Sequence, residues 1–272
     1  MGKPVNRVLF VNSEIMPFLP ETPLSRIGRC LPQGIQERKK EIRAFMPRYG
    51  CINERKNQLH EVIRLSGMNI IIGDVDRPLV IKVASISSAR IQVYFIDNED
   101  YFRRKQISYD ADGKFFEDNG QRAIFFARGV LETVKKLRWV PDVIHCQGWI
   151  SHLVPLYLKK AYNGDPIFSG SRIVTSLYNE AAEEKLSPSL KDNVLFGGIK
   201  PADVSLLEEP TGINLAKTAA LYSDGIILGD KDVAPELVKF CEERSMPILP
   251  FSEDSISSGR YIEEYDGFYQ QL

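Results

Sequence analysis

Short apolar strands alternate with amphipathic helices along most of this chain, and this alternation constrains its fold more than any other feature. Seven runs have strand character, at 8–12, 41–46, 92–96, 142–146, 172–176, 225–228 and 247–249. Helix-forming stretches separate many of them, at 121–136, 148–162, 213–222 and 231–243. Strands that alternate with helices are typical of a doubly wound, mainly parallel sheet. We therefore predict one Rossmann-like α/β domain over residues 1–272.

One region departs from this alternation. Between residues 59 and 97 four β-rich runs follow one another without helices, namely HEVIRL, MNIIIG, LVIKVAS and IQVYFID. Gly67, Gly73 and the segment 74–78 interrupt them at short intervals. Strands that follow one another through short turns pair antiparallel, so we expect an antiparallel extension of the sheet here.

Composition excludes several classes of function. A net charge of −1 gives no general attraction to nucleic acid or to an anionic membrane, so neither is expected as a partner. No apolar run approaches the length that crosses a bilayer, and the first residues carry no secretory segment. The four cysteines have no paired spacing, which is typical of reduced thiols. We expect a cytoplasmic location.

The sequence offers no metal site, cofactor motif or nucleophile elbow. His145 and Cys146 are adjacent at the end of a predicted strand, so their side chains point to opposite faces of the sheet and cannot share a metal. Neither a phosphate-binding P-loop nor a G-x-G-x-x-G dinucleotide motif is present. We therefore expect no metal and no cofactor.

Several motifs in the correct order resemble one enzyme family. The opening RVLFVNSEIMPFLP and the following PETPLSRIGRCLP are similar to the start of bacterial glycogen synthases and plant starch synthases. The matching positions there are Ser13, Glu14, Pro17, Leu24, Leu31 and Pro32. Later stretches that resemble the family are IRAFMPRYG, VYFIDNEDYFRR, RWVPDVIHCQGW, GDPIF and NLAKTAALYSDGI.

This resemblance implies a fold and a reaction. The family consists of retaining glycosyltransferases of the GT-B fold that extend an α-1,4-glucan from ADP-glucose. The chain resembles the N-terminal half of such an enzyme, and it ends at Leu272, near the point where the family begins a second domain that holds most of the donor nucleotide. The expected fold is therefore one half of a GT-B enzyme without a donor domain.

The donor loop of the family is altered in this chain. Where the family has Lys-Thr-Gly-Gly, the sequence reads Pro20-Glu21-Thr22-Pro23, and Arg26 replaces a family Asp. Glycine N–H groups approach a diphosphate closely and lysine neutralises it, whereas proline has no N–H and glutamate repels it. The resemblance therefore implies that binding of the donor diphosphate is lost.

Two further motifs are altered. Tyr178 stands where the family T-x-H-N motif has a histidine that contacts the donor sugar, and Asn179 is kept. In the family motif H-x-H-D-W, Gln147 and Gly148 replace His and Asp. We predict no catalytic residue, only a residual binding cleft. Its candidate residues are Glu14, Glu21, Thr22, His145, Gln147, Trp149, Tyr178 and Asn179.

Three functions compete at this point. The first is a catalytically silent relative that binds a glucan or a protein partner in glycogen metabolism. The second is an ADP-glucose-dependent glucan synthase subunit whose donor domain comes from another chain. The third is an enzyme with altered chemistry that uses Tyr178 and His145. Loss of the donor loop favours the first. A glucan or nucleotide-sugar ligand and a protein partner or homodimer are the expected interactions.

Overall fold

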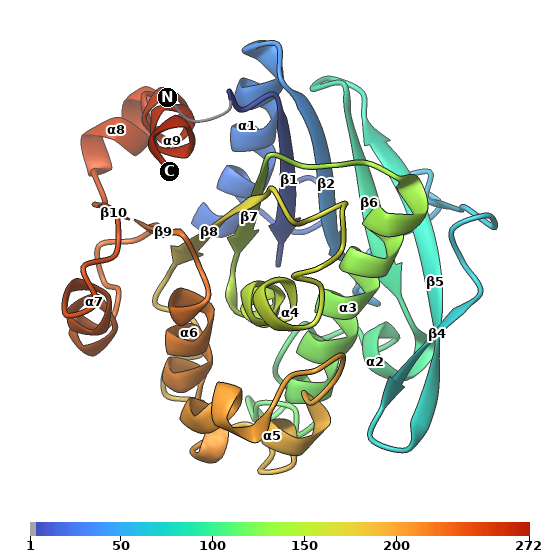
Figure 1. Ribbon diagram of the computed structural model, residues 1–272. Helices are drawn as coiled ribbons and strands as arrows, with labels where there is room; N and C mark the ends of the chain where they lie inside the picture. Colours follow the sequence, from blue (N-terminus) through green and yellow to red (C-terminus); the bar gives the residue numbers. More distant parts are fainter. Residues whose placement is uncertain (1–3) are drawn as a thin grey trace.

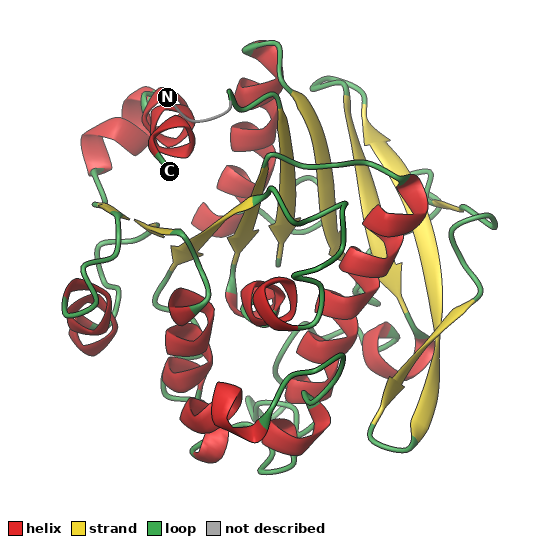
Figure 2. Cartoon of the chain, viewed as in Figure 1, coloured by secondary structure: helices red, strands yellow, loops and turns green. Residues whose placement is uncertain are grey.

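A computed structural model describes residues 4–272, and its centre is a mixed β-sheet (Figures 1 and 2). The strand order is β10-β9-β8-β7-β1-β2-β6-β5-β3, with β4 paired to β5. Every pair from β10 to β6 is parallel, whereas β5 runs antiparallel to β6, β3 and β4. The strands are β1 Arg7–Asn12, β2 Glu41–Pro47, β3 His60–Glu61, β4 Met68–Ile72, β5 Val75–Ile86, β6 Ile91–Asp97, β7 Val143–Gln147, β8 Arg172–Leu177, β9 Gly225–Leu228 and β10 Ile248–Leu249.

Helices cover both faces of this sheet. The α-helices are α1 Pro23–Glu37, α2 Glu99–Phe102, α3 Asn119–Leu137, α4 Val154–Lys160, α5 Leu190–Asn193, α6 Gly212–Leu221, α7 Pro235–Glu242, α8 Glu253–Ser258 and α9 Tyr261–Gln271. Two 3₁₀ turns, η1 Trp149–Ser151 and η2 Pro201–Glu208, complete the set. Figure 1 shows α3, α4 and α6 in front of the sheet and α1 behind it. This is the two-sided cover expected of parallel strands.

The central strands explain the apolar runs of the sequence. Every residue of β7 is buried, and so are five of the six residues of β1. Strands covered on both faces read as continuous apolar runs, which confirms the predicted mainly parallel α/β sheet. None of the helices between residues 4 and 272 has the length and apolar character needed to cross a membrane.

The antiparallel extension is confirmed, with one difference inside it. The segment 74–78 was expected to interrupt the strands, yet β5 begins at Val75 and runs through Pro78. Pro78 lies in the part of β5 that pairs with β4. The chain therefore turns at Gly73, where φ is +58°.

Two predicted helices are shorter than expected. The stretch 148–162 contains the η1 turn followed by α4, because Gly148 has a φ of +86° and α4 starts only at Val154, with Pro155 in its first turn. The stretch 231–243 becomes α7, which starts at Pro235. Proline favours the first turn of a helix, so both helices begin next to one.

The C-terminal helix α9 packs against α1 and the sheet. Its Tyr261, Tyr265, Phe268 and Tyr269 are buried. The Arg172 guanidinium donates to the Tyr269 carbonyl at 2.8 Å, and this contact places α9 beside the first residue of β8. The last turns of α9 therefore lie beside the amino end of β8.

Candidate functional site

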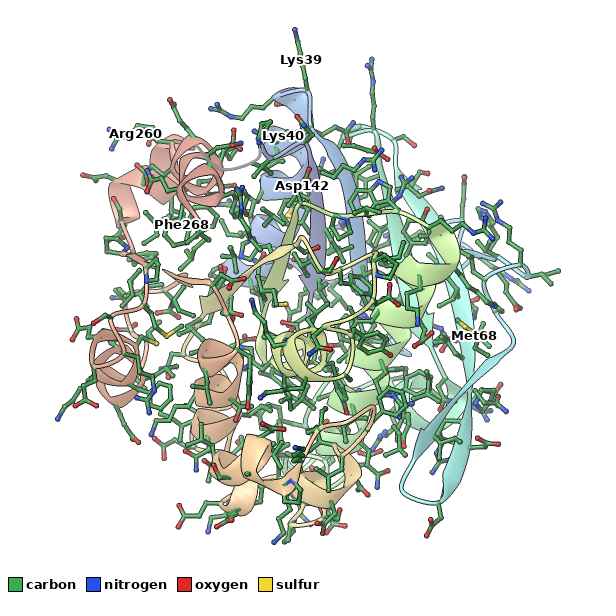
Figure 3. The ribbon with its side chains drawn as sticks, in the orientation of Figure 1. Lys39, Lys40, Met68, Asp142, Arg260 and Phe268 are labelled. Carbon is green, nitrogen blue, oxygen red and sulfur yellow. The ribbon has the colours of Figure 1, made fainter. Side chains whose placement is uncertain are left out.

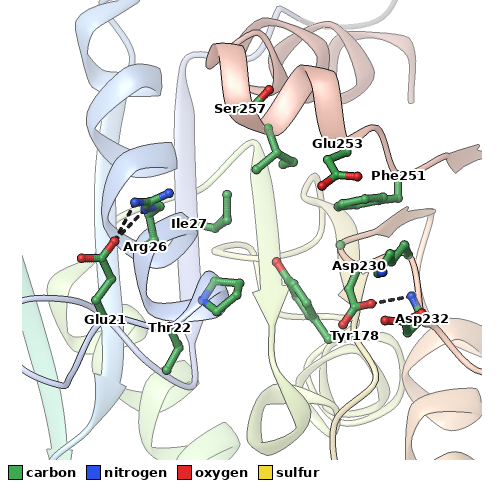
Figure 4. Close-up of a pocket in the computed structure, with 14 residues that line it drawn as sticks. Glu21, Thr22, Arg26, Ile27, Tyr178, Asp230, Asp232, Phe251, Glu253 and Ser257 are labelled. Carbon is green, nitrogen blue, oxygen red and sulfur yellow. Dashed lines mark hydrogen bonds and ion pairs between the residues drawn. The ribbon is translucent and has the colours of Figure 1, made fainter.

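A cavity of about 880 Å³ lies beside the N-terminus of α1 (Figure 4). Four segments form it: the start of α1, the turn that follows β8, the turn that follows β9, and the stretch that contains α8. The carboxyl ends of parallel strands are where open α/β sheets bind ligands. The lining residues are Glu21, Thr22, Pro23, Arg26, Ile27, Tyr178, Gly229, Asp230, Lys231, Asp232, Phe251, Glu253, Ile256 and Ser257.

The start of α1 forms one wall of the cavity, and hydrogen bonds within the helix cap occupy its polar groups. Thr22 is the N-cap, and its hydroxyl accepts from the Ser25 N–H at 3.0 Å while the Ser25 hydroxyl accepts from the Thr22 N–H at 2.8 Å. Pro23 occupies the first turn and has no N–H. This helix start therefore has few N–H groups left for an anion.

Charged side chains at this wall are also paired. The Arg26 guanidinium donates to the Glu21 carboxylate at 2.9 Å, so each neutralises the other. The Thr22 hydroxyl donates to the Glu14 carboxylate at 2.9 Å. Burial raises the pKa of Glu14 above its usual value, and this hydrogen bond offsets only part of the rise. Arg26 therefore lines the cavity as one half of an ion pair.

The cavity as a whole has an excess of negative charge. Its lining includes four carboxylates and two cations, Arg26 and Lys231. Asp230 accepts from the Asp232 N–H at 2.5 Å and from the Asn179 N–H at 3.4 Å, which fixes the turn after β9. An anionic ligand is repelled by this surface, whereas a neutral one with many hydroxyl groups finds acceptors for its hydrogen bonds.

A row of buried polar side chains lies behind the cavity. Strand register places Asn12 of β1 beside Gln147 of β7, and Gln147 beside Ser176 of β8. The Gln147 amide donates to the Leu24 carbonyl of α1 at 3.3 Å. Among the described residues, both amide atoms of Asn12 have no hydrogen-bond partner, while the buried Tyr178 hydroxyl lies against Gln147 and Ser176. Tyr178 connects this row to the cavity, because it also lines the cavity.

His145 belongs to the sheet interior and does not line the cavity. Its Nδ1 lies 2.7 Å from the Tyr269 hydroxyl, and its Nε2 lies 2.7 Å from the Ser176 hydroxyl. Complete burial lowers the pKa of His145 to about 3, so the ring is neutral. A neutral imidazole has one donor and one acceptor nitrogen, which suits both contacts. The geometry makes His145 a link between the sheet and α9.

A second carboxyl lies near Glu14 that the sequence motifs do not predict. The Glu180 carboxylate accepts from the Trp149 N–H at 3.3 Å. Burial, and to a smaller extent the charge of Glu14, raise the pKa of Glu180 to about 8. The signal available in the sequence was its place directly after Asn179, at the end of a strand. Trp149 itself is buried and does not line the cavity.

The predicted site residues are therefore divided in space. Glu21, Thr22 and Tyr178 line the cavity; Glu14, Gln147 and Asn179 support it from behind; His145 and Trp149 lie elsewhere in the core. Sequence reasoning missed Gly229, Phe251 and the carboxylates at 230, 232 and 253. No three His, Cys, Asp or Glu side chains gather as a metal ligand set in the part of the chain that the structure describes.

Comparison with solved structures supports the fold. The catalytic domain of Starch Synthase IV from Arabidopsis thaliana, bound to ADP and acarbose, superposes with a TM-score of 0.65 at 16% identity. The match covers 83% of this chain and 45% of the plant chain. The chain therefore has the fold of one half of a GT-B glycosyltransferase, as predicted.

Sequence comparison identifies the family. A glycogen synthase from Chlorobium limicola is 35% identical over 235 residues, which is 85% of this chain and 47% of the relative. One from Chlorobium phaeobacteroides is 38% identical over 257 residues, 88% of this chain and 50% of the relative. The chain thus spans about half the length of these relatives. The family profile described as "Starch synthase catalytic domain" matches residues 7–246. This chain belongs to the starch synthase catalytic domain family.

Proposed function

We propose that this chain is a glycogen synthase-like protein without synthase activity of its own, and that it binds a neutral α-glucan in the cavity beside α1. One observation carries the proposal. Where the family resemblance places Lys-Thr-Gly-Gly, this chain has Pro20-Glu21-Thr22-Pro23, of which the last three line the cavity; Glu21 is paired to Arg26, and Thr22 caps the helix. Synthesis requires stabilisation of charge on the leaving diphosphate, and this wall does not provide it.

The ligand class follows from the lining of the cavity. Tyr178 and Phe251 offer aromatic surface, and the carboxylates of Asp230, Asp232 and Glu253 accept hydrogen bonds from hydroxyl groups. The plant relative was solved with both ADP and acarbose, so its family fold accommodates a nucleotide and a carbohydrate. In this chain the excess of carboxylates favours the carbohydrate. The candidate contacts Glu14, Gln147 and Asn179 would then support the lining residues from behind.

A glycosyltransferase subunit that receives its donor domain from another chain is the alternative. Family membership favours it, and the altered donor loop opposes it. The two proposals differ in one property, since a subunit that works with a separate donor domain should retain affinity for the sugar nucleotide. A cytoplasmic location and a protein partner or homodimer remain predictions under either proposal.

Calorimetric titration separates these functions. The purified chain should release heat with maltoheptaose and none with ADP-glucose at the same concentration. Labelled glucose from ADP-glucose should not be incorporated into glycogen above a buffer blank. Binding of ADP-glucose without turnover would favour the subunit alternative, and incorporation by protein free of host synthase would show that the chain is an active synthase.

A further inference from the structure

Helix α8 forms one wall of the cavity and lies beyond the residues that match the family profile. Glu253, Ile256 and Ser257 of this helix line the cavity, together with Phe251 just before it. Figure 4 shows Glu253 and Ser257 on the side of the cavity opposite Arg26 of α1. The profile match ends at residue 246, so the family domain does not account for this wall.

Few contacts attach α8 to the rest of the protein. Ser255 is the one buried residue among its six, and four of the others are exposed. The Ser255 hydroxyl donates to the Glu264 carboxylate of α9. Within residues 4–272, every other hydrogen bond of α8 joins residues between 252 and 260. A single hydrogen bond therefore ties α8 to another element of the fold.

The neighbouring helix α9 is anchored much more firmly. Four of its aromatic side chains are buried, Asp266 pairs with Lys40, and the Gln270 side chain accepts from the Val5 N–H at 3.2 Å. Gly259 lies between the two helices with a φ of +79°, and a Cβ there would meet no atom within 4 Å beyond its chain neighbours. Glycine adopts φ values that other residues rarely reach, so the chain can bend at Gly259 while α9 stays fixed.

The facing walls of the cavity are complementary in charge and in apolar surface. Glu253 on α8 is exposed and forms no ion pair within residues 4–272, while Arg26 on α1 pairs with Glu21 at an exposed position. Ile256 of α8 and Ile27 of α1 both line the cavity. Movement of α8 toward α1 would bring opposite charges closer and would remove apolar surface from water, so both effects favour closure.

We infer that α8 is a lid, which closes toward α1 over a carbohydrate bound in the cavity and bends away at Gly259 to release it. Helix α9 is the fixed base of this lid. Segments with few buried contacts open locally more often than the core, and a ligand held beneath such a segment slows its opening. The inference rests on the proposed function for the identity of the ligand, and it adds how the ligand is enclosed.

Hydrogen exchange of the full chain, followed by mass spectrometry, tests the lid with maltoheptaose as the probe. In the free protein, the amides of α8 should exchange at least about ten-fold faster than those of α9. With maltoheptaose at about 100 times its Kd, exchange in α8 should slow by about 10- to 100-fold, because the lid must open against the bound ligand. Exchange in α9 should not change. Equal exchange of the two helices in the free protein would overturn the lid.

A serine variant tests how the lid is attached. Ser255→Ala removes the hydrogen bond to Glu264, so exchange in α8 of the free protein should become about ten-fold faster, while exchange in α9 should hardly change. Ser257→Ala is the matched control, because the Ser257 hydroxyl bonds to the Asp254 carbonyl within α8, and it should not speed exchange. Faster exchange of both helices in Ser255→Ala would show that they move as one body and would overturn the lid.

The outcomes separate this inference from the proposed function. Calorimetric binding of maltoheptaose with unchanged exchange in α8 overturns the lid alone. No binding by the wild-type chain overturns the proposed glucan function and, with it, closure over a carbohydrate. Binding together with slower exchange that is confined to α8 supports both.

Discussion

Buried polar side chains at the middle of strand β7 have all their hydrogen-bond partners, whereas those at its carboxyl end do not. At the middle, His145 has a partner for each ring nitrogen, Tyr269 on one side and Ser176 on the other. At the carboxyl end, the Gln147 amide makes one long hydrogen bond, to the Leu24 carbonyl at 3.3 Å, and both amide atoms of Asn12 beside it on β1 have no partner within residues 4–272. His145 and Gln147 are only two residues apart on one strand, yet His145 belongs to a complete chain of hydrogen bonds and Gln147 to an incomplete one.

The paired groups at the middle of β7 contribute to stability, whereas the incompletely paired groups at its carboxyl end lie beside the proposed binding cavity. A buried polar group with a partner inside the protein helps to define one packing arrangement, whereas a buried group without a partner lowers stability. The complete chain attaches α9 to the sheet, and Lys40 with Asp266 adds an ion pair of 2.5 Å between the segment after α1 and α9. The incomplete row lies beside the cavity. Figure 3 shows Lys40 and Phe268 in the upper part of the molecule.

The largest expected effect is a loss of stability at His145. His145→Leu keeps most of the volume but leaves the Tyr269 and Ser176 hydroxyls unpaired, so unfolding free energy should fall by about 2–4 kcal/mol. Gln147→Leu is the matched variant two residues along the strand, and it should cost about 1 kcal/mol because it loses one long hydrogen bond. Urea denaturation measures both. Equal losses would remove the distinction between the middle and the carboxyl end of β7.

Glu180 should make stability depend on pH. Its pKa is raised from 4.5 to about 8, chiefly by burial, so the folded protein binds more protons than the unfolded chain between these values. Stability should therefore fall as pH rises through this window. Glu180→Gln retains an acceptor for the Trp149 N–H and carries no charge. It should be more stable than wild type by about 1–2 kcal/mol at about pH 9, after allowance for partial exposure, and similar at about pH 4.

Denaturation of wild type and Glu180→Gln over this pH range measures the effect. The difference should appear only as pH rises and should be absent in acid. A constant difference at every pH would mean that the Glu180 carboxyl titrates normally and that the substitution acts through packing.

The smallest expected effect is at the cavity wall. Arg26→Ala breaks an exposed pair with Glu21, so stability should change by less than about 0.5 kcal/mol. The cavity becomes more negative, and neutral maltoheptaose should bind as before. Calorimetry on this variant tests whether charge selects the ligand; a loss of maltoheptaose binding would show that Arg26 contacts the ligand directly.

Much of the fold could be predicted from the sequence because its strands are buried on both faces. Runs such as VIHC and IVTS have few alternatives to a central parallel strand, and seven predicted strands are present with small shifts at their ends. The first residues of two helices were less predictable, because Gly148 and Pro235 determine the backbone conformation where these helices begin. That a single domain covers residues 1–272 stays a prediction.

The candidate site was less predictable, because four segments that are distant in the sequence form it. Glu21, Thr22 and Tyr178 could be found from altered motifs, and they do line the cavity. His145 looked equally promising in the sequence, but it lies on the inward side of β7, where only the fold shows that α9 covers it. Phe251 and Glu253 belong to a stretch without a motif. Their role depends on where the chain places α8 relative to α1.

The most direct test compares one side chain of the core with one of the cavity lining. Tyr269→Phe and Glu253→Ala are measured in parallel for unfolding free energy and for the Kd of maltoheptaose. Tyr269→Phe should lose about 1–2 kcal/mol of stability, because Nδ1 of His145 is left unpaired, and should bind maltoheptaose like wild type. Glu253→Ala should change stability by less than about 0.5 kcal/mol, because its side chain is exposed, and should bind maltoheptaose more weakly, because the cavity loses one acceptor for sugar hydroxyls. Equal losses of stability in both variants, with unchanged maltoheptaose binding in both, would contradict this expectation.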